Sequence, residues 1–400
     1  MEQTADWIAA TGDGGVMRVV DPDLLRSNAF RAEWDALAAN ASEPNPFFES
    51  WYLLPSLDLF DVLRKTRILA LYNNDGGSER LVGLFPVGSN FDYYGYRLPH
   101  LFTWSHANIF LGTPLVAAGF EHAFWGALLD WADRNAALAL FLHCPDIPAD
   151  GPIFAALRDV AIRHSRPAAI VQSYERALLK SDDDAESYFA ASVNGKRRKE
   201  FRRRAKRFAE GGEVSLEQTR GDEGISDWLK EFLALEQAGW KGDEASALAC
   251  CDKTTALFRQ TMMAAANLGR LDRVTLRLDG KMVAGLLTVT AGSGAFSYKT
   301  AYDEAHAKAS PGVMLQRHYL ETLADPVLDW TDSCAAPDHP MIDHFWRERR
   351  PMVRVSIPVG GSMRQAIARG IIRQETGRPV VGALDVLLEK PQTLTVERAR

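Results

Sequence analysis

The hydrophobic pattern of this chain contains two similar pairs of strand-length apolar runs, one pair in each half. The pairs are residues 67–72 with 80–87, and residues 273–278 with 282–289. Each pair flanks a short polar turn that contains an Asp-Gly dipeptide. Apolar runs on both sides of Asp-Gly are a strong signal for a β-hairpin. The pattern therefore predicts one hairpin in each half.

The segments around the two hairpins also follow one another in the same order. Two helical patterns precede each hairpin, and a strand, a helix and a buried strand follow it. This repeated order predicts the duplication of one α/β unit. The alternative is that such orders recur by chance in α/β chains. The expected helices are residues 31–40, 47–57 and 121–135 in the first half, and 225–237, 254–267 and 312–324 in the second.

The length of 400 residues exceeds what one hydrophobic core usually organises, since domains hold about 100–200 residues. The fold expected is α/β, with two fused domains that each contain a twisted mixed sheet flanked by helices. We expect an N-terminal domain at 1–175, a C-terminal domain at 176–355 and a helical appendage at 356–400. A strand at 168–179 is expected to join the two domains.

Composition and charge narrow the setting in which the protein works. The apolar share of 46% and the charged share of 24% are those of a soluble globular protein. The net charge of −6 does not attract nucleic acid or anionic membranes, so an anion site has to be local. No apolar run approaches the roughly 20 residues of a membrane-spanning helix. The N-terminus does not resemble a signal peptide, and the four cysteines lack C-x-x-C spacing, so we expect a cytoplasmic protein with reduced thiols.

The sequence Ser310-Pro311-Gly312 is typical of the start of a helix that follows a strand. Serine suits the position before the helix, proline suits its first residue, and glycine leaves the first amides accessible. Val313 begins the apolar stripe of this helix. A helix start of this kind can bind a phosphate group. The alternative is a capped helix without a ligand.

The strand that precedes this helix ends in two residues with acid–base chemistry. Alternation along residues 294–303 places Tyr298 and Tyr302 on one face and Lys299 and Asp303 on the other. Asp303 could take a proton from an amine nucleophile, and Tyr302 could protonate a leaving thiolate. The alternative is that the tyrosine packs in the core and the aspartate caps a turn.

Nine basic residues lie between Lys196 and Arg207, on a helical pattern with an apolar stripe. They form either a solvated face or a contact for phosphate, CoA, a carrier protein or tRNA, because clustered arginines bind phosphates. Farther along the chain, Trp240 and Lys241 follow a helix. Those two residues either close over a substrate or anchor their own loop.

A polar loop at residues 332–344 follows the last buried strand of the second half. Asp332, His339 and His344 belong to it, but the five-residue spacing of the histidines does not place two metal ligands on one helix face. A substrate-pocket loop and a structural turn are both compatible with this pattern, and no metal is expected. The chain contains no P-loop, no G-x-S-x-G motif and no H-E-x-x-H motif.

Taken together, the basic helix, "GWK", "GRLDRVTLRLDGKMVAGLL", "YKTAYDEAHAKASPG" and "DSCAAPDHPMIDHFW" resemble the GNAT acyltransferase domain of the CelD/BcsL type. "NPFFESWYLLP" and "LVGLFPV" are similar to the N-terminal half of that family. The resemblance covers about 300 residues. Each motif is weak alone, and their order is the specific feature.

The resemblance implies a tandem GNAT fold, related to the Fem peptidyltransferases, that transfers an acyl group from acyl-CoA to an amine or a hydroxyl. It also implies a link to cellulose or other exopolysaccharide production. The GNAT pyrophosphate signature is absent, and Ser310-Pro311-Gly312 stands in its place. The donor is therefore acyl-CoA, an acyl-carrier protein or aminoacyl-tRNA.

The expected site follows from these motifs. The alternatives to a thioester-dependent acyltransferase are a Fem-like aminoacyltransferase, a GNAT-shaped binding protein without turnover, and a metal hydrolase at 332–344. The expected residues are Asp303 and Tyr302 for catalysis, Ser310, Pro311, Gly312 and Val313 for the donor, and Trp240, Lys241, Lys299, Asp332 and His339 for the substrate.

Overall fold

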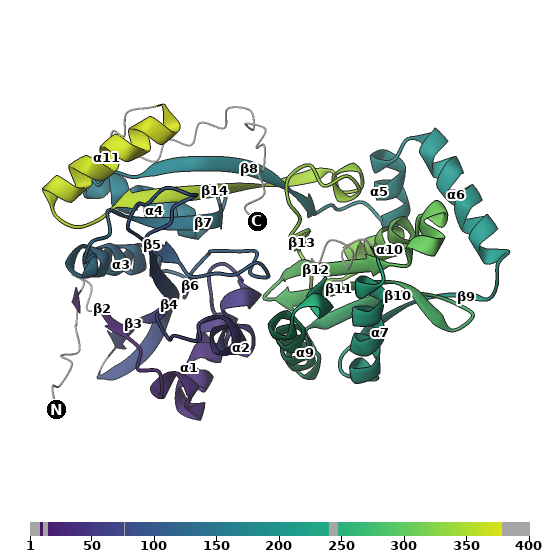
Figure 1. Ribbon diagram of the computed structural model, residues 1–400, viewed down its shortest axis with the longest axis horizontal. Coiled ribbons are helices and arrows are strands. Elements are labelled where there is room, and N and C mark those ends of the chain that lie inside the picture. The colour runs from purple at the N-terminus through teal and green to yellow at the C-terminus, as the bar shows by residue number, and fades with distance from the viewer. Residues whose placement is uncertain (1–8, 11–14, 76, 240–246, 378–400) are drawn as a thin grey trace. The chain divides into compact units, whose positions relative to one another are not determined.

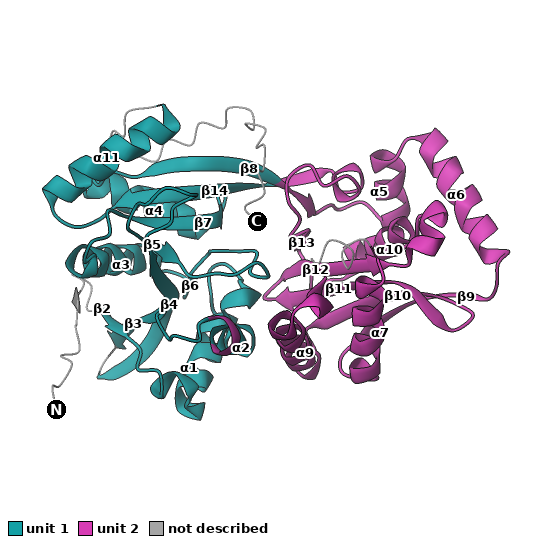
Figure 2. Ribbon diagram, viewed as in Figure 1, with its two compact units in different colours: residues 1–57, 61–175, 350–400 teal, residues 58–60, 176–349 magenta. Residues whose placement is uncertain are grey.

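The computed structural model describes residues 9–10, 15–75, 77–239 and 247–377 (Figure 1). The chain divides into two compact units (Figure 2). Unit 1 comprises Met1–Leu57, Asp61–Glu175 and Arg350–Arg400, and unit 2 comprises Asp58–Phe60 and Arg176–Arg349.

Unit 1 is a mixed sheet covered by helices. Its strands are β1 (Ala9–Ala10), β2 (Gly15–Val19), β3 (Arg67–Asp75), β4 (Ser78–Asn90), β5 (His100–Thr103), β6 (Leu115–Val116), β7 (Phe141–Pro148) and most of β8 (Ala169–Leu179) and β14 (Glu348–Pro358). Its helices are α1 (Asn28–Ala39), α2 (Ser50–Phe60), α3 (Glu121–Asn135), α4 (Pro152–Arg163) and α11 (Ser362–Thr376), with 3-10 turns η1 (Leu24–Arg26) and η2 (Pro46–Phe48). The strand order is β1-β2-β3-β4-β5-β7-β14-β8, and β6 pairs with β4.

The first predicted hairpin is β3–β4, and the close approach of α3 depends on a glycine in it. Gly83 lies opposite Leu71, next to a bulge in the hairpin. A Cβ atom at Gly83 would lie 2.5 Å from Cδ2 of Phe124 in α3, so only glycine fits without displacement. After the hairpin, β5 pairs with β7 in parallel, with Phe102 opposite His143.

Unit 2 repeats this order. Its strands are β9 (Val214–Arg220), β10 (Leu271–Leu278), β11 (Lys281–Ala291), β12 (Gly294–Tyr302) and β13 (Trp330–Asp332), which extend from β8 in the order β8-β13-β12-β11-β10-β9. Its helices are α5 (Ala185–Ser192), α6 (Gly195–Ala209), α7 (Ile225–Gln237), α9 (Asp252–Asn267) and α10 (Pro311–Tyr319). Short 3-10 segments are η3 (Leu248–Cys250), η4 (Glu304–Ala309), η5 (Leu320–Ala324) and η6 (Ile342–His344).

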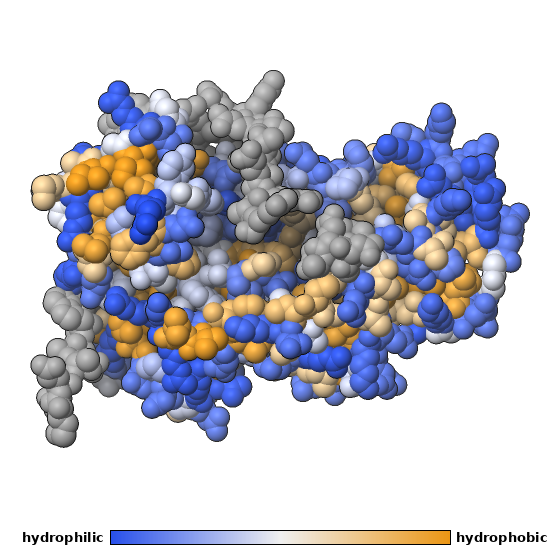
Figure 3. Space-filling model, viewed as in Figure 1, coloured by the Kyte–Doolittle hydropathy of each residue, from blue (hydrophilic) through white to orange (hydrophobic). Residues whose placement is uncertain are grey.

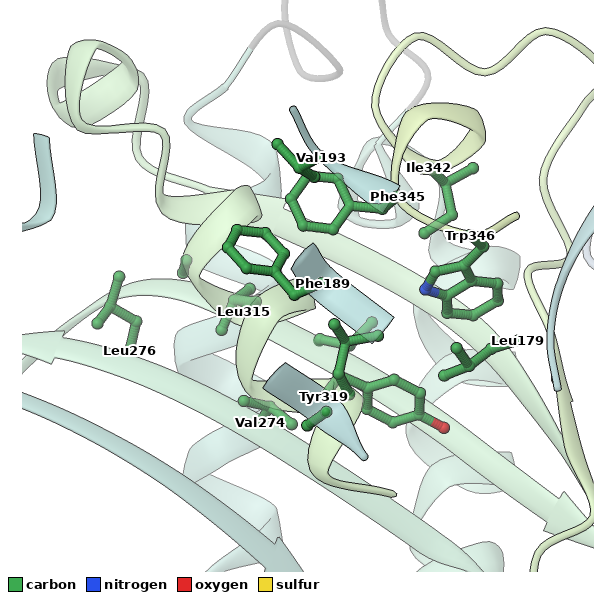
Figure 4. Packing of buried hydrophobic residues seen from close by; sticks show 14 of the residues in the cluster. Leu179, Phe189, Val193, Val274, Leu276, Leu315, Tyr319, Ile342, Phe345 and Trp346 are labelled. Atoms are coloured by element: carbon green, nitrogen blue, oxygen red, sulfur yellow. The ribbon is translucent and has the colours of Figure 1, made fainter. Parts of the chain in front are cut away.

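Helix α10 lies on one face of this sheet and buries its apolar side. Leu315 and Tyr319 of α10 pack in one cluster with Val274 of β10 and with Phe345 and Trp346 from the segment after η6 (Figure 4). The burial of such apolar side chains stabilises each by about 1.5–3 kcal/mol relative to exposure. The position of α10, and with it the position of its first residues, is therefore fixed by the core.

The α/β fold class, with two fused units that each hold a mixed sheet flanked by helices, is confirmed. The hairpin, a strand, a helix and a parallel partner strand occur in this order in both units. The boundaries expected for the domains stay a prediction. Residues 350–400, most of which were expected to form an appendage, are counted in unit 1, where β14 pairs with β7. None of the helices in the described part of the chain has the length and apolar character needed to cross a lipid bilayer.

Candidate functional site

The start of α10 is built as the sequence predicts, with one difference at Ser310, the residue before the helix. Ser310 precedes the helix in the left-handed conformation, with φ of 58°, and Pro311 is the first helical residue. The Ser310 side chain does not cap the helix. Its Oγ atom instead accepts a hydrogen bond from Nη1 of Arg204, at 2.9 Å. A guanidinium group therefore stands next to the helix start.

Arg204 belongs to α6, the predicted basic helix. Asn194 caps this helix by accepting a hydrogen bond from the N–H of Arg197, and Phe201 and Phe208 pack on the core of unit 2. The rest of the helix surface is hydrophilic (Figure 3). This division follows from the apolar stripe, which leaves most of the cationic side chains near solvent.

A cavity of about 490 Å³ lies between α6 and η4. Among the described residues of its wall, Glu200 is the one carboxylate, and its side chain accepts hydrogen bonds from Arg203 and Arg204. Guanidinium groups bind phosphate oxygens in bidentate geometry, so the excess of cations here can attract an anion. The lining residues are Glu200, Arg203, Arg204, Arg207, Ala307 and Lys308.

The end of β12 lies beside the start of α10. A Cβ atom at Gly312 would lie 3.2 Å from Sδ of Met341 and 4.0 Å from Cδ1 of Tyr302. Tyr302 is half-buried and packs against the unit 2 core. Asp303 begins η4, and its Oδ1 atom accepts a hydrogen bond from the N–H of Ala305 at 3.0 Å. Its Oδ2 atom is 4.0 Å from Nζ of Lys281, and the side chain is 24% exposed.

The expected sharing of one face by Tyr298 and Tyr302 is wrong. The pairing of β11 with β12 matches Leu287 to Lys299 and Thr288 to Ser297, so a bulge passes over Tyr298. Tyr298 stacks on Phe258 of α9, at 6.3 Å between ring centroids, whereas Tyr302 packs in the cluster under α10. A bulge reverses the alternation of side chains and removes an amide from the regular ladder.

Two further predicted residues have structural contacts. Asp332 is fully buried and pairs with Arg176 at 3.4 Å, and it also accepts a hydrogen bond from the N–H of Cys334. Nδ1 of His339 lies 3.3 Å from the N of Ile342 at the start of η6. Their contact with a substrate stays a prediction, as does that of the half-buried Lys299. Trp240 and Lys241 lie outside the described residues.

The Tyr302 ring therefore lies next to Gly312, whereas Asp303 begins η4 and Ser310, at the end of η4, contacts Arg204. No sequence pattern separates Arg203, Arg204, Arg207 and Lys308 from the other basic residues. Positions 203 and 204 lie four and three residues before position 207 on α6, but positions 202 and 206 are also four apart, so helical spacing does not single out this group. Within the described residues, no group of three or more His, Cys, Asp or Glu side chains is arranged to hold a metal ion.

Comparison with known proteins places this site in a recognised kind of domain. Residues 195–339 match the family described as an acetyltransferase (GNAT) domain. This segment contains the α6–η4 cavity, β12 and the start of α10. The assignment to the CelD/BcsL type stays a prediction. No curated protein matches the chain.

Solved structures show similarity of fold at low sequence identity. The crystal structure of FemX is 12% identical, with a TM-score of 0.55, and the match covers 84% of this chain and 98% of FemX. A conserved protein of unknown function from Bacteroides thetaiotaomicron is 12% identical, with a TM-score of 0.52, over 82% of this chain and 97% of that one. The C-terminal domain of a protein from Agrobacterium fabrum, named as a lysylphosphatidylglycerol synthetase, is 13% identical, with a TM-score of 0.50. That match covers 89% of this chain and 100% of the domain.

Proposed function

We propose that the protein is an acyltransferase that moves an acyl group from a phosphate-bearing thioester, acyl-CoA or an acyl-carrier protein, to an amine or hydroxyl acceptor. The observation that carries this proposal is the cationic α6–η4 cavity beside the start of α10, inside the segment that matches a GNAT domain. The same proposal places the protein in the cytoplasm and gives it a role in exopolysaccharide production.

The donor phosphates would be bound chiefly by side chains. Pro311 has no N–H, and the N–H groups of Val313 and Met314 are within hydrogen-bond distance of the Ser310 carbonyl. Among the described residues, the N–H of Gly312 is then the first amide of α10 left for a ligand. In a GNAT domain with the glycine signature, backbone amides would contact the phosphates. Here the positive charge for the phosphates comes from the side chains of Arg203, Arg204, Arg207 and Lys308.

The transfer itself needs no covalent enzyme intermediate. Asp303 takes the proton from the attacking nitrogen or oxygen, which forms a bond to the thioester carbonyl carbon. The C–S bond then breaks, and Tyr302 gives its proton to the leaving sulfur. Positioning of the donor supplies much of the acceleration.

The test of the donor site is the stabilisation that a donor gives to the folded protein. Acetyl-CoA and longer acyl-CoA at 100 times their dissociation constant should raise the free energy of unfolding by about 2.7 kcal/mol. In Arg204→Ala, affinity should fall at least tenfold, since a charged hydrogen bond is worth about 1.5–3 kcal/mol. The matched control is Arg202→Ala, which removes an exposed α6 cation that does not line the cavity. Equal losses in both variants would contradict a localised site.

The test of the base is turnover. Asp303→Asn keeps an oxygen for the N–H of Ala305 but cannot accept a proton, so turnover should fall about 10²–10⁴-fold. Glu304→Gln, at the adjacent exposed position, is the control and should retain turnover. Unchanged turnover in a folded Asp303→Asn protein would remove Asp303 from the mechanism.

A second candidate is an aminoacyltransferase that uses charged tRNA. Nine cationic residues lie on α6, and three of them line the cavity, so a longer polyanion also fits the charge of this helix. Binding of tRNA should then weaken steeply with salt, with a log–log slope of about −0.9 per phosphate contacted in a duplex. Absence of transfer with any thioester or aminoacyl ester would leave a binding protein without turnover.

A further inference from the structure

Unit 1 contains a second cavity, of about 320 Å³, beside the parallel strands β5 and β7. Ligand pockets span roughly 300–1,000 Å³, so this one suits a single ring better than a nucleotide cofactor. Five rings contribute to its wall, those of Tyr93, Tyr94, His100, Phe102 and His143. All of these residues belong to unit 1.

The wall is fixed by a chain of hydrogen bonds around His143. Arg354 donates from Nη1 to the Tyr94 hydroxyl at 3.2 Å, and this hydroxyl lies 3.1 Å from Nε2 of His143. Nδ1 of His143 lies 3.0 Å from Oγ of Ser356, its cross-strand partner. Burial, with a smaller effect of the Arg354 charge, lowers the pKa of His143 to about 3, so the ring is neutral. With Arg354 donating to Tyr94, the Tyr94 hydroxyl donates to Nε2, and Nδ1–H donates to Ser356.

His100 presents a hydrogen-bond acceptor in the same wall. Its Nδ1 lies 2.9 Å from the carbonyl oxygen of Leu98, which can only accept, so Nδ1 carries the proton. Burial lowers the pKa of His100, and the neutral ring then has an unprotonated Nε2. Among the described residues, no donor is found for this nitrogen. A ligand hydroxyl is a suitable donor.

Asn90, at the rim of this cavity, adds a hydrogen-bond donor. The Oδ1 atom of Asn90 accepts hydrogen bonds from the N–H groups of Phe91 and Asp92, at 2.7 and 3.2 Å. Its NH₂ group has no acceptor among the described residues and can donate. A hydroxyl group both donates and accepts, and therefore matches a wall that offers one group of each kind.

The charges around the cavity favour an uncharged ligand. The Arg354 guanidinium also contacts Asp146, with Nε 3.1 Å from Oδ1, so its charge is balanced within the protein. Asp92 accepts a hydrogen bond from the N–H of Gly95. Both imidazoles are neutral, so the described residues of the wall offer no cation to pair with an anionic ligand.

We propose that this cavity binds an uncharged ring that carries hydroxyl groups, with a ring face against Tyr94 and Phe102 and a hydroxyl donating to Nε2 of His100. The ring is either a saturated sugar or a phenol, because both carry hydroxyl groups on an uncharged ring. The site stands independently of acyl transfer, because every residue that forms it belongs to unit 1.

The experiment is a titration of the full chain, followed by calorimetry and by saturation-transfer NMR. The uncharged probes are methyl β-glucoside, myo-inositol and catechol, and the charged comparators are glucosamine and glucuronate. We expect saturable binding of the sugar-type probes or of catechol, which identifies the ring, and about tenfold weaker binding of the charged comparators.

Two tyrosines of one loop give the matched variants. Tyr94 lines the cavity and is 59% exposed, whereas Tyr96 is 70% exposed and does not line it. Tyr94→Ala should weaken binding about tenfold, and Tyr96→Ala less than twofold. If Tyr94→Ala does not fold, Asn90→Ala at an exposed position serves in its place, with about a fivefold loss expected. Absence of saturable binding, equal losses in the variant and the control, or tighter binding of a charged comparator would overturn the proposal.

Discussion

The two units share an order of elements but differ in what they place at corresponding points. The helix after the first post-hairpin strand begins with Glu121 in unit 1, and this carboxylate accepts hydrogen bonds from the N–H of Gly119 at 3.0 and 3.2 Å. The corresponding helix in unit 2, α10, has no acidic residue in its first turn and stands next to Arg204. A helix start that already holds a carboxylate does not attract a second anion, so this comparison favours unit 2 for the proposed phosphate site.

The parallel strand pairs differ in the same way. In unit 1, β7 places the neutral ring of His143 opposite Phe102, beside an open cavity. In unit 2, β13 ends at Asp332, whose buried carboxylate pairs with Arg176. Unit 1 thus has a cavity beside its parallel strand pair, whereas the parallel pair of unit 2 ends at a buried ion pair.

The largest effect should come from opening this ion pair. Asp332→Asn leaves Arg176 as a buried charge without its counterion, which typically costs about 3–5 kcal/mol of unfolding free energy. Urea denaturation followed by fluorescence measures this loss. The double variant Arg176→Met with Asp332→Leu should recover most of it, because both charges are gone. A loss below about 1 kcal/mol in the single variant would mean that the pair does not hold unit 2 together.

The second largest effect on the free energy of unfolding is expected from Glu43, a carboxylate at a helix start in unit 1. Glu43 accepts a hydrogen bond from the N–H of Ile153 in the first turn of α4, and burial raises its pKa from 4.5 to about 7. The charge of Arg350 acts in the opposite direction, and those of Asp150 and Glu121 act in the same direction as burial. The folded state therefore binds more protons than the unfolded state between pH 4.5 and 7, and stability falls as pH rises through this window.

Glu43→Gln removes this titration. Relative to the variant, the wild type should lose about 2–3 kcal/mol between pH 5 and pH 8, since one pKa unit corresponds to 1.36 kcal/mol. Urea denaturation at both pH values gives the difference. A constant difference between wild type and variant across this range would show that Glu43 does not titrate there.

Two glycines at similar places in the hairpins allow a direct contrast. A Cβ atom at Gly83 would lie 2.5 Å from Phe124 of α3, but one at Gly285 would lie 3.0 Å from Phe232 of α7. Gly83→Ala should therefore cost about 1–3 kcal/mol through overpacking, and Gly285→Ala should cost less. Urea denaturation of the two variants gives the order, and a larger loss for Gly285→Ala would contradict it.

The same glycines show what a sequence pattern can and cannot predict. Asp-Gly turns and apolar runs predicted both hairpins because these signals are local. The side of the sheet that each glycine faces, toward α3 in one unit and toward α7 in the other, depends on bulges and on which helix packs there. The bulge at Tyr298 reversed the predicted face of that residue for this reason.

The candidate site shows the same limit. The helix start at Pro311 follows from proline and glycine preferences in adjacent residues. The hydrogen bond between Arg204 and Ser310 joins residues 106 positions apart, and no periodicity in α6 distinguishes Arg204 from Arg202. Similarly, the cavity in unit 1 unites residues from three separate segments, 90–95, 100–105 and 143–145, none of which carries a motif.

The smallest effect on stability sharpens the contrast between the two helix starts. Gly312→Ala adds a methyl group 3.2 Å from the flexible Met341 side chain, so the unfolding free energy should change by less than about 1 kcal/mol. If the Gly312 amide contacts the donor, the same methyl group should reduce the stabilisation given by acyl-CoA. Gly126→Ala in α3 is the control, since its Cβ meets no atom within 4 Å and should stabilise the protein by about 0.5–1 kcal/mol without changing the donor effect. Thermal unfolding with and without acyl-CoA measures both quantities. An undiminished donor effect in Gly312→Ala would place the phosphates on the α6 cations alone, since an alanine there would crowd a ligand held at the first amide of α10.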